Sequence, residues 1–196
     1  MAYISLYRKY RPKKFSDVVG QDVVVKILRN SIIENKIGHA YIFAGPRGIG
    51  KTSIAKIFSK AVNCLNSIDG DLCGKCESCI NDINNEIDIV EIDAASNNGV
   101  EEIREIRNNI KLMPTKLKYK VYIIDEVHML SIGAFNALLK TLEEPQEFIV
   151  IILISSNENN ILATVKSRCT KMYFHKLTDV SLKTFINEKF KKCSSY

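Results

Sequence analysis

Residues 45–52 read Gly-Pro-Arg-Gly-Ile-Gly-Lys-Thr and match the phosphate-binding loop pattern G-x-x-x-x-G-K-[ST] in full. In such a loop, glycines let backbone amides turn toward phosphate oxygens, and the N-terminus of the following helix adds positive potential. We expect Lys51 to reach the terminal phosphates and the Thr52 hydroxyl to bind Mg²⁺. The alternative is a chance glycine turn, which the position between a predicted strand and a predicted helix disfavours. The predicted nucleotide-binding residues are Gly45, Pro46, Arg47, Gly48, Ile49, Gly50, Lys51, Thr52 and Ser53.

Two adjacent carboxylates, Asp125 and Glu126, follow a short apolar run. One carboxylate can hold the Mg²⁺ shell while the other positions and polarises the attacking water. Adjacent acids at a strand end are often only solvated, but a phosphate-binding loop on the same predicted sheet favours the catalytic interpretation. His128 is expected to be packed or hydrogen-bonded, with no chemical role.

Two serines, Ser155 and Ser156, end a later apolar run. A small hydroxyl there could touch the γ-phosphate or the attacking water. A serine at a strand end more often only makes a turn. The residues alone leave both interpretations open.

Four cysteines have a spacing typical of a metal site: Cys64 is followed by Cys73, Cys76 and Cys79. Four thiolates can converge tetrahedrally around structural Zn²⁺. An iron–sulfur cluster also uses close cysteines, but its usual last cysteine lies downstream beside a proline, and the sequence has none there. Unliganded thiols are the third possibility. Cys169 and Cys193 are interpreted as free thiols.

These residues need a scaffold in which strands alternate with helices. Apolar runs predict strands at 40–44, 87–92, 121–124 and 149–155, and helical periodicity predicts helices at 24–32, 54–62, 100–110, 131–143 and 180–192. Ser131 can cap the fourth helix and Pro145 stops it. Such alternation predicts a parallel α/β sheet covered on both faces, with ligands at the carboxyl ends of the strands.

The chain has 196 residues, enough for one α/β domain and a short appendage. Its longest apolar run, 148–154, is far below the ~20 residues that cross a bilayer, and its charged N-terminus is unlike a secretory signal. We therefore expect a cytoplasmic protein without a membrane partner. The net charge of +6 is consistent with binding to nucleic-acid phosphates or with a basic surface that is only solvated. The basic residues cluster at Arg8, Lys9, Arg11, Lys13 and Lys14 and at Lys189, Lys191 and Lys192.

Further segments, taken with the loop, the acids and the cysteines, resemble one family. They are Arg11-Pro12 with Phe15, residues 18–21 (Val-Val-Gly-Gln), 125–130 (Asp-Glu-Val-His-Met-Leu), 138–145 (Leu-Leu-Lys-Thr-Leu-Glu-Glu-Pro) and 167–169 (Ser-Arg-Cys). In this order they are similar to the gamma/tau subunit of the bacterial DNA polymerase III clamp loader, an AAA+ ATPase. The resemblance covers nearly the whole chain and includes the cysteine insert.

The resemblance implies a P-loop AAA+ fold, with a parallel sheet flanked by helices at 1–177, a zinc-binding insert at 64–79 and the start of a helical lid domain at 178–196. It implies an ATPase motor that opens the sliding clamp and loads it on primed DNA, within a nucleotidyltransferase holoenzyme. The implied cofactors are ATP, Mg²⁺ and Zn²⁺. The implied hetero-oligomer contains delta, delta-prime and further gamma/tau copies.

The resemblance also implies roles for single residues. The implied catalytic residues are Lys51, Asp125, Glu126, Ser156 and Arg168. Ser156 would be the first sensor, and Arg168 an arginine finger acting on the neighbouring subunit. From the residues alone, Arg168 could equally be a surface ion-pair residue. Thr52 and Asp125 would hold Mg²⁺. Tyr7, Arg11 and Val19 match the segment that cradles adenine and ribose.

Two features depart from the family pattern. The sequence stops within the first helix of the lid. Relatives carry basic, DNA-facing residues where this chain has Asn97, Asn98 and Gly99, so Arg104 and Arg107 are the remaining candidates for a DNA contact.

Two other functions fit part of the evidence. A non-hydrolysing scaffold subunit, like delta-prime, would share the fold and the zinc insert, but the intact Lys51, Thr52, Asp125 and Glu126 argue against it. Another AAA+ ATPase, for replication initiation or branch migration, would share the nucleotide chemistry but not the cysteine insert or the segment 142–145.

Overall fold

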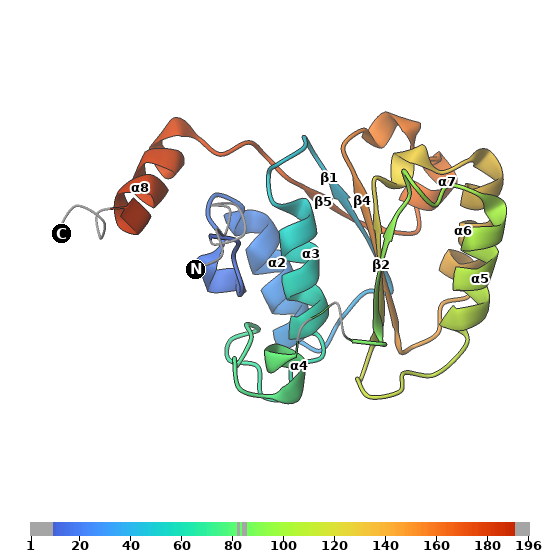
Figure 1. Cartoon of the computed structure of the whole chain (residues 1–196), viewed down its shortest axis with the longest axis horizontal. Coiled ribbons are helices and arrows are strands. Elements are labelled where there is room, and N and C mark those ends of the chain that lie inside the picture. The colour runs from blue at the N-terminus through green and yellow to red at the C-terminus, as the bar shows by residue number, and fades with distance from the viewer. Residues whose placement is uncertain (1–9, 82, 84–85, 191–196) are drawn as a thin grey trace, which may run out of the picture.

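The computed structural model describes residues 10–81, 83 and 86–190, with the side chains of 180 and 188–190 excepted. Within that range, five parallel strands form one sheet in the order β2-β3-β4-β1-β5, and helices cover both faces (Figure 1). This arrangement confirms the predicted α/β class. Tyr7, Arg8, Lys9, Lys191, Lys192 and Cys193 lie outside the described residues.

The strands are short and mostly buried. Their bounds are β1 (Ala40–Ala44), β2 (Ile89–Asp93), β3 (Lys120–Asp125), β4 (Ile149–Ser155) and β5 (Thr170–Tyr173). All residues of β1 and β4 are buried, because these central strands have helices on both sides. Ala44 pairs with Ser155, and Ile124 pairs with Leu153. The ends of β1, β3 and β4 therefore reach the same edge of the sheet.

Two apolar cores flank the sheet. On one face, α2 (Asp22–Ile33) and α3 (Lys51–Ala61) pack with Phe43 and Ile152. On the other face, α5 (Val100–Ile110), α6 (Ile132–Glu143) and α7 (Ala163–Lys166) pack with Ile42 and Leu153 (Figure 1). The alternation of residues 42 and 43 between the two cores follows from the two-residue repeat of a strand.

Short elements connect these layers. They are η1 (Phe15–Asp17), α4 (Glu77–Ile80), η3 (Val127–Met129) and η4 (Glu158–Asn160), and α8 (Asp179–Phe190) follows the last strand. In the described part of the chain, no helix is both long and apolar enough to cross a membrane.

The structure adds one strand to the predicted sheet and shifts another. β5 escaped prediction because it is an edge strand in which only Met172 is buried, so its residues show no apolar run. β2 begins at Ile89, two residues later than predicted, because Ile87 is exposed and the Asp88 carboxylate bonds to the loop before β3.

Asp88 anchors the loop between α5 and β3. It is 1% exposed, and its carboxylate accepts the backbone N–H groups of Thr115, Lys116 and Leu117 at 2.7–3.0 Å. Burial by itself would raise the pKa of Asp88, but these three amides outweigh it and the pKa is lowered. The buried charge therefore stabilises the native loop.

We predict that Asp88→Asn lowers the free energy of unfolding by about 2–3 kcal/mol, because a carboxamide cannot accept all three amides. The pKa of Asp88 in the folded protein lies below its unfolded value of ~3.9. The stabilisation by the Asp88 carboxylate is therefore complete above about pH 4 and is lost as the pH falls through the folded pKa. Urea unfolding of both proteins should show the largest difference near pH 7 and a shrinking one below about pH 4. Glu105→Gln, an exposed acid on α5, is the control, and an equal loss in that variant would contradict the prediction.

Candidate functional site

The loop between β1 and α3 depends on glycine at defined points. Gly45 has φ +148°, and a Cβ atom there would lie 2.5 Å from the carbonyl oxygen of Phe174. Gly50 directly precedes α3 with φ +95°, a left-handed conformation that side chains disfavour. The sequence therefore folds here into a tight turn that aims the first amides of α3 at the loop interior.

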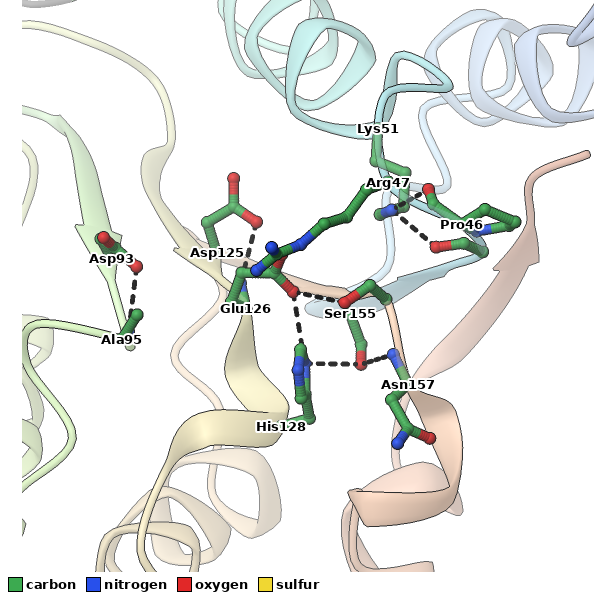
Figure 2. Close-up of polar contacts among 12 residues, drawn as sticks. Pro46, Arg47, Lys51, Asp93, Ala95, Asp125, Glu126, His128, Ser155 and Asn157 are labelled. Atoms are coloured by element: carbon green, nitrogen blue, oxygen red, sulfur yellow. Dashed lines mark hydrogen bonds and ion pairs between the residues drawn. The ribbon is translucent and has the colours of Figure 1, made fainter. Parts of the chain in front are cut away.

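Lys51 lies inside this turn. Its Nζ donates to the carbonyl oxygens of Gly45 at 2.6 Å and Pro46 at 2.5 Å (Figure 2). The residue is only 7% exposed, and burial lowers the pKa of its ammonium, against the opposing charges of Glu126 and Asp125. A cation held by neutral carbonyls at a helix N-terminus is suited to a polyanionic ligand.

Thr52 and Asp125 join the loop to the third strand. The Thr52 hydroxyl donates to Asp125 Oδ2 at 2.8 Å, and the other carboxylate oxygen accepts the backbone N–H of Glu126 at 2.8 Å. Hydroxyl and carboxylate oxygens together are the ligand types that Mg²⁺ takes beside phosphates. The structure thus brings together the two predicted magnesium ligands.

Glu126 lies at the centre of a polar network. Its Oε1 accepts from Arg47 Nε at 2.7 Å, and its Oε2 accepts from Ser156 Oγ at 2.8 Å. Oε2 also lies 3.3 Å from His128 Nδ1 (Figure 2). Burial opposes ionisation, but the bonds from Ser156 and Arg47 outweigh it and lower the pKa of Glu126. The carboxylate is therefore ionised, as an acceptor of a proton from water must be.

The network extends through His128 and Ser155 to Asn157, which the sequence analysis did not implicate. His128 Nδ1 is 3.2 Å from Ser155 Oγ, which accepts the backbone N–H of Asn157 at 3.0 Å. His128 is thus hydrogen-bonded, as expected. The Arg47–Glu126 contact joins residues 79 positions apart, and no spacing rule could have predicted it.

Two adjoining hollows open beside the loop. The first, about 1210 Å³, is lined by Arg11, Lys51, Thr52, Ser53, Asp125 and Glu126, among others. The second, about 470 Å³, is lined by Val18, Val19, Ile49, Leu177, Leu182 and Phe185, among others. The cationic side chains of the first hollow suit phosphates, and the more apolar lining of the second hollow suits a base. Arg11 also donates from Nε to Ser53 Oγ at 3.0 Å.

Arg168 lies near the amino ends of the strands, opposite the end that carries the phosphate loop. It precedes β5, whose first residue, Thr170, pairs with Tyr41 in β1. Gly45 lies four positions after Tyr41, which is about 13 Å along the strand. The guanidinium bonds to Glu143 Oε1 and to the Thr164 carbonyl, each at 2.8 Å. The sheet thus holds Arg168 away from the phosphate loop of its own chain.

The proposed DNA-facing residues lie on or before α5. Arg104 pairs with Glu101 at the exposed surface of this helix, and Arg107 is half-buried one turn later. Asn98 accepts the backbone N–H of Ser131 through its carbonyl. Nothing in these contacts marks a nucleic-acid site, and the assignment stays a prediction.

The four cysteine sulfurs converge at the carboxyl end of α3, all within 4.8 Å of one another. Four of the pairs lie 3.4–3.8 Å apart. A tetrahedral Zn²⁺ with Zn–S of ~2.3 Å requires about 3.8 Å. Backbone amides of Lys75 and Cys76 donate to Cys73 and lower the pKa of its thiol to about 6. The donor set fits a metal that binds thiolates.

Cys169 is separate from this cluster. It is half-buried against the core beneath α6 and α7, and burial raises the pKa of its thiol to about 12. It is a free thiol in the structure, as expected.

Comparison with known proteins identifies relatives along most of the chain. A family model described as DNA polymerase III, delta subunit, matches residues 20–178. The chain is 54% identical over 183 residues to DNA polymerase III subunit tau of Bacillus subtilis (strain 168), covering 93% of this chain and 32% of that protein. It is 44% identical over 178 residues to the tau subunit of Escherichia coli (strain K12), covering 90% and 28%. The chain thus spans about a third of the length of these relatives.

Solved structures show the same fold. A DNA polymerase III gamma subunit-related protein of Thermotoga maritima superposes with a TM-score of 0.62 at 22% identity, over 85% of this chain and 51% of that one. The Thermotoga maritima RuvB Holliday junction branch migration motor gives 0.65 at 19%, over 94% and 55%. These likenesses confirm the predicted P-loop AAA+ fold.

Proposed function

Since this chain belongs to the DNA polymerase III delta-subunit family and is similar to gamma/tau subunits, we propose that it binds Mg-ATP and hydrolyses it to open a sliding clamp and load it on primed DNA. The observation that carries the proposal is the placement of Lys51, Thr52, Asp125 and Glu126 around one hollow. A cation, two metal ligands and an ionised base in one place are what phosphoryl transfer to water requires.

Binding begins with the loop amides and Lys51. The ammonium leaves the carbonyls of Gly45 and Pro46 for the β- and γ-phosphate oxygens, while the amides at the start of α3 hold the remaining phosphate charge. Thr52 and Asp125 would hold Mg²⁺, which neutralises charge on the phosphates. Val19 and Arg11 lie beside the expected base and ribose.

Hydrolysis then depends on Glu126. Its carboxylate orients the attacking water and accepts a proton from it as the water attacks the γ-phosphorus, while the bond from that phosphorus to the bridging oxygen breaks and ADP leaves. Ser156 already bonds to Glu126 at 2.8 Å, so its hydroxyl can hold the base or contact the γ-phosphate as a sensor. Arg47 forms an ion pair with Glu126, and this pair must break before the base can face the water.

Arg168 completes the site of a neighbouring subunit. Its position at the amino edge of the strands, with a partly exposed side chain, supports a role in trans as an arginine finger. The proposed assembly is a hetero-oligomer in the cytoplasm with delta, delta-prime and further gamma/tau copies. A scaffold without turnover is the alternative, and the complete set of catalytic groups disfavours it.

For the cysteine insert, we propose structural Zn²⁺ held by Cys64, Cys73, Cys76 and Cys79. Sulfur separations near the tetrahedral value and amides donating to Cys73 and Cys64 support this assignment. Four protein ligands leave no open position, so the metal serves stability rather than catalysis.

We predict that Lys51→Ala slows ATP hydrolysis by the assembled loader on the order of 100-fold, because the γ-phosphate loses its charged donor. The assay is phosphate release with clamp and primed DNA present. Lys36→Ala, a surface lysine paired with Glu34 that lines neither hollow, is the matched control. Turnover by Lys51→Ala as fast as that of the parent would refute the motor function.

For the proposed finger, Arg168→Ala should leave ATP binding by the isolated chain unchanged and slow hydrolysis at least tenfold in the assembled ring. Glu143→Gln removes the ion pair but keeps the guanidinium, so it should change the rate less than twofold. Equal defects in both variants would show that Arg168 acts only as an ion-pair partner. Loss of binding in the isolated chain would also contradict the role in trans.

Metal analysis should find one Zn²⁺ per freshly purified chain, because four thiolates form one closed site. Cys76→Ser should lose most of the metal and melt several degrees lower, since structural zinc contributes to folding. Cys169→Ser, outside the cluster, should keep the full zinc content. A parent protein that contains no zinc would remove the assignment.

A further inference from the structure

The cysteine insert begins with a tight turn that packs on α2. Ile68 and Asp71 form an antiparallel bridge, and Asp69 and Gly70 between them have φ of +49° and +73°. Arg29 Nε donates to the Asp69 carbonyl at 2.7 Å. A Cβ atom on Gly70 would lie 2.5 Å from the Arg29 carbonyl oxygen, so the turn fits this helix closely. The turn therefore has a fixed place on the domain.

Asp71 extends from this turn to the N-terminal segment. Its Oδ1 accepts the backbone N–H of Phe15 and its Oδ2 that of Ser16, both at 2.9 Å, across 55 or more positions of sequence. Oδ1 also accepts the N–H of Leu72 at 2.8 Å. Asp71 is 8% exposed. A buried carboxylate satisfied by three amides holds the start of η1 in one place.

The segment that Asp71 holds lines the nucleotide hollows on both sides of η1. Before η1, Arg11 and Pro12 line the larger hollow, and from its end Asp17, Val18 and Val19 line the smaller one. Phe15 itself is 1% exposed in the core. A shift of η1 would therefore move the walls of both hollows but leave the phosphate loop, which starts at Gly45, in place.

On its other side, Asp71 is joined to the cysteine cluster. Cys73 follows two residues later, and its backbone N–H donates to Cys64 Sγ at 3.4 Å. Cys64 ends the turn after α3, the helix that begins with Lys51. Asp71 thus links the insert to η1, between the segments that line the two hollows.

We propose that Asp71 is a positioning residue for the nucleoside part of the ligand, through which the state of the cysteine insert sets nucleotide affinity. The proposal rests on the proposed function, because it assumes that the hollows bind ATP. It assigns the insert a task beyond stability: loosening of the insert weakens recognition of the nucleoside and leaves recognition of the phosphates intact.

Calorimetric titration of the chain with ATP and with inorganic tripolyphosphate, each with Mg²⁺, separates these two parts. Asp71→Asn should bind ATP about tenfold more weakly, since the carboxamide cannot accept all three amides, and bind tripolyphosphate within about twofold of the parent. Asp69→Asn removes the same charge from the exposed turn and should change neither affinity. Equal weakening of both ligands in Asp71→Asn, or no weakening of ATP, would overturn the proposal.

Hydrogen exchange tests the same link without a ligand. The amides of Phe15 and Ser16 should exchange at least tenfold faster in Asp71→Asn, and also in the parent after the metal is removed with a chelator, while amides of β4 stay protected. Unchanged protection of Phe15 and Ser16 in both samples would overturn the proposal even if Asp71→Asn is too unstable to titrate. A parent that binds neither ligand would instead refute the proposed function, and faster exchange would still support the link between Asp71 and η1.

Discussion

The hydrogen bond from Thr52 to Asp125 depends on the whole sheet being in place. The two residues are 73 positions apart, at the start of α3 and the end of β3, and β4 lies between β1 and β3 in the sheet. Because Ala44 pairs with Ser155 and Ile124 with Leu153, the loop after β1 and the acids at the end of β3 lie at the same level. A one-residue slip would move this edge by about 3.3 Å, more than a hydrogen bond tolerates.

Much of this arrangement could be predicted because its signals are local. The loop 45–52, the acids 125–126 and the cysteine triplet are contiguous or closely spaced, and the central strands are unbroken apolar runs. β5 escaped because its four residues, Thr-Lys-Met-Tyr, contain no apolar run and bury only Met172, and η1 escaped because its position is set by Asp71, 55 residues away. The contact of Arg47 with Glu126 could not be predicted for a similar reason, because polar pairs distant in the sequence leave no periodic pattern.

The charged groups of the site have protein partners before any ligand enters. Lys51 is held by two carbonyls, and Glu126 is shared by Arg47, Ser156 and His128. A buried ion without partners would be costly, so these contacts stabilise the fold. In the proposed function they would also restrain the chemistry, because phosphate would have to replace the carbonyls at Lys51 and Arg47 would have to move before Glu126 faces water. Binding of phosphate and activation of the base would then be separate steps.

Under the proposed function, the same geometry would leave the site incomplete within one chain. The phosphate loop opens at the carboxyl edge of the strands, while Arg168 precedes β5 at the amino edge and is separated from the loop by the length of the sheet. Arg47, which pairs with Glu126, would neutralise the proposed base and not the transferred phosphoryl group. Charge developing on that group would then need a donor from another subunit. Hydrolysis would depend on assembly because parallel strands place the two functions at opposite edges.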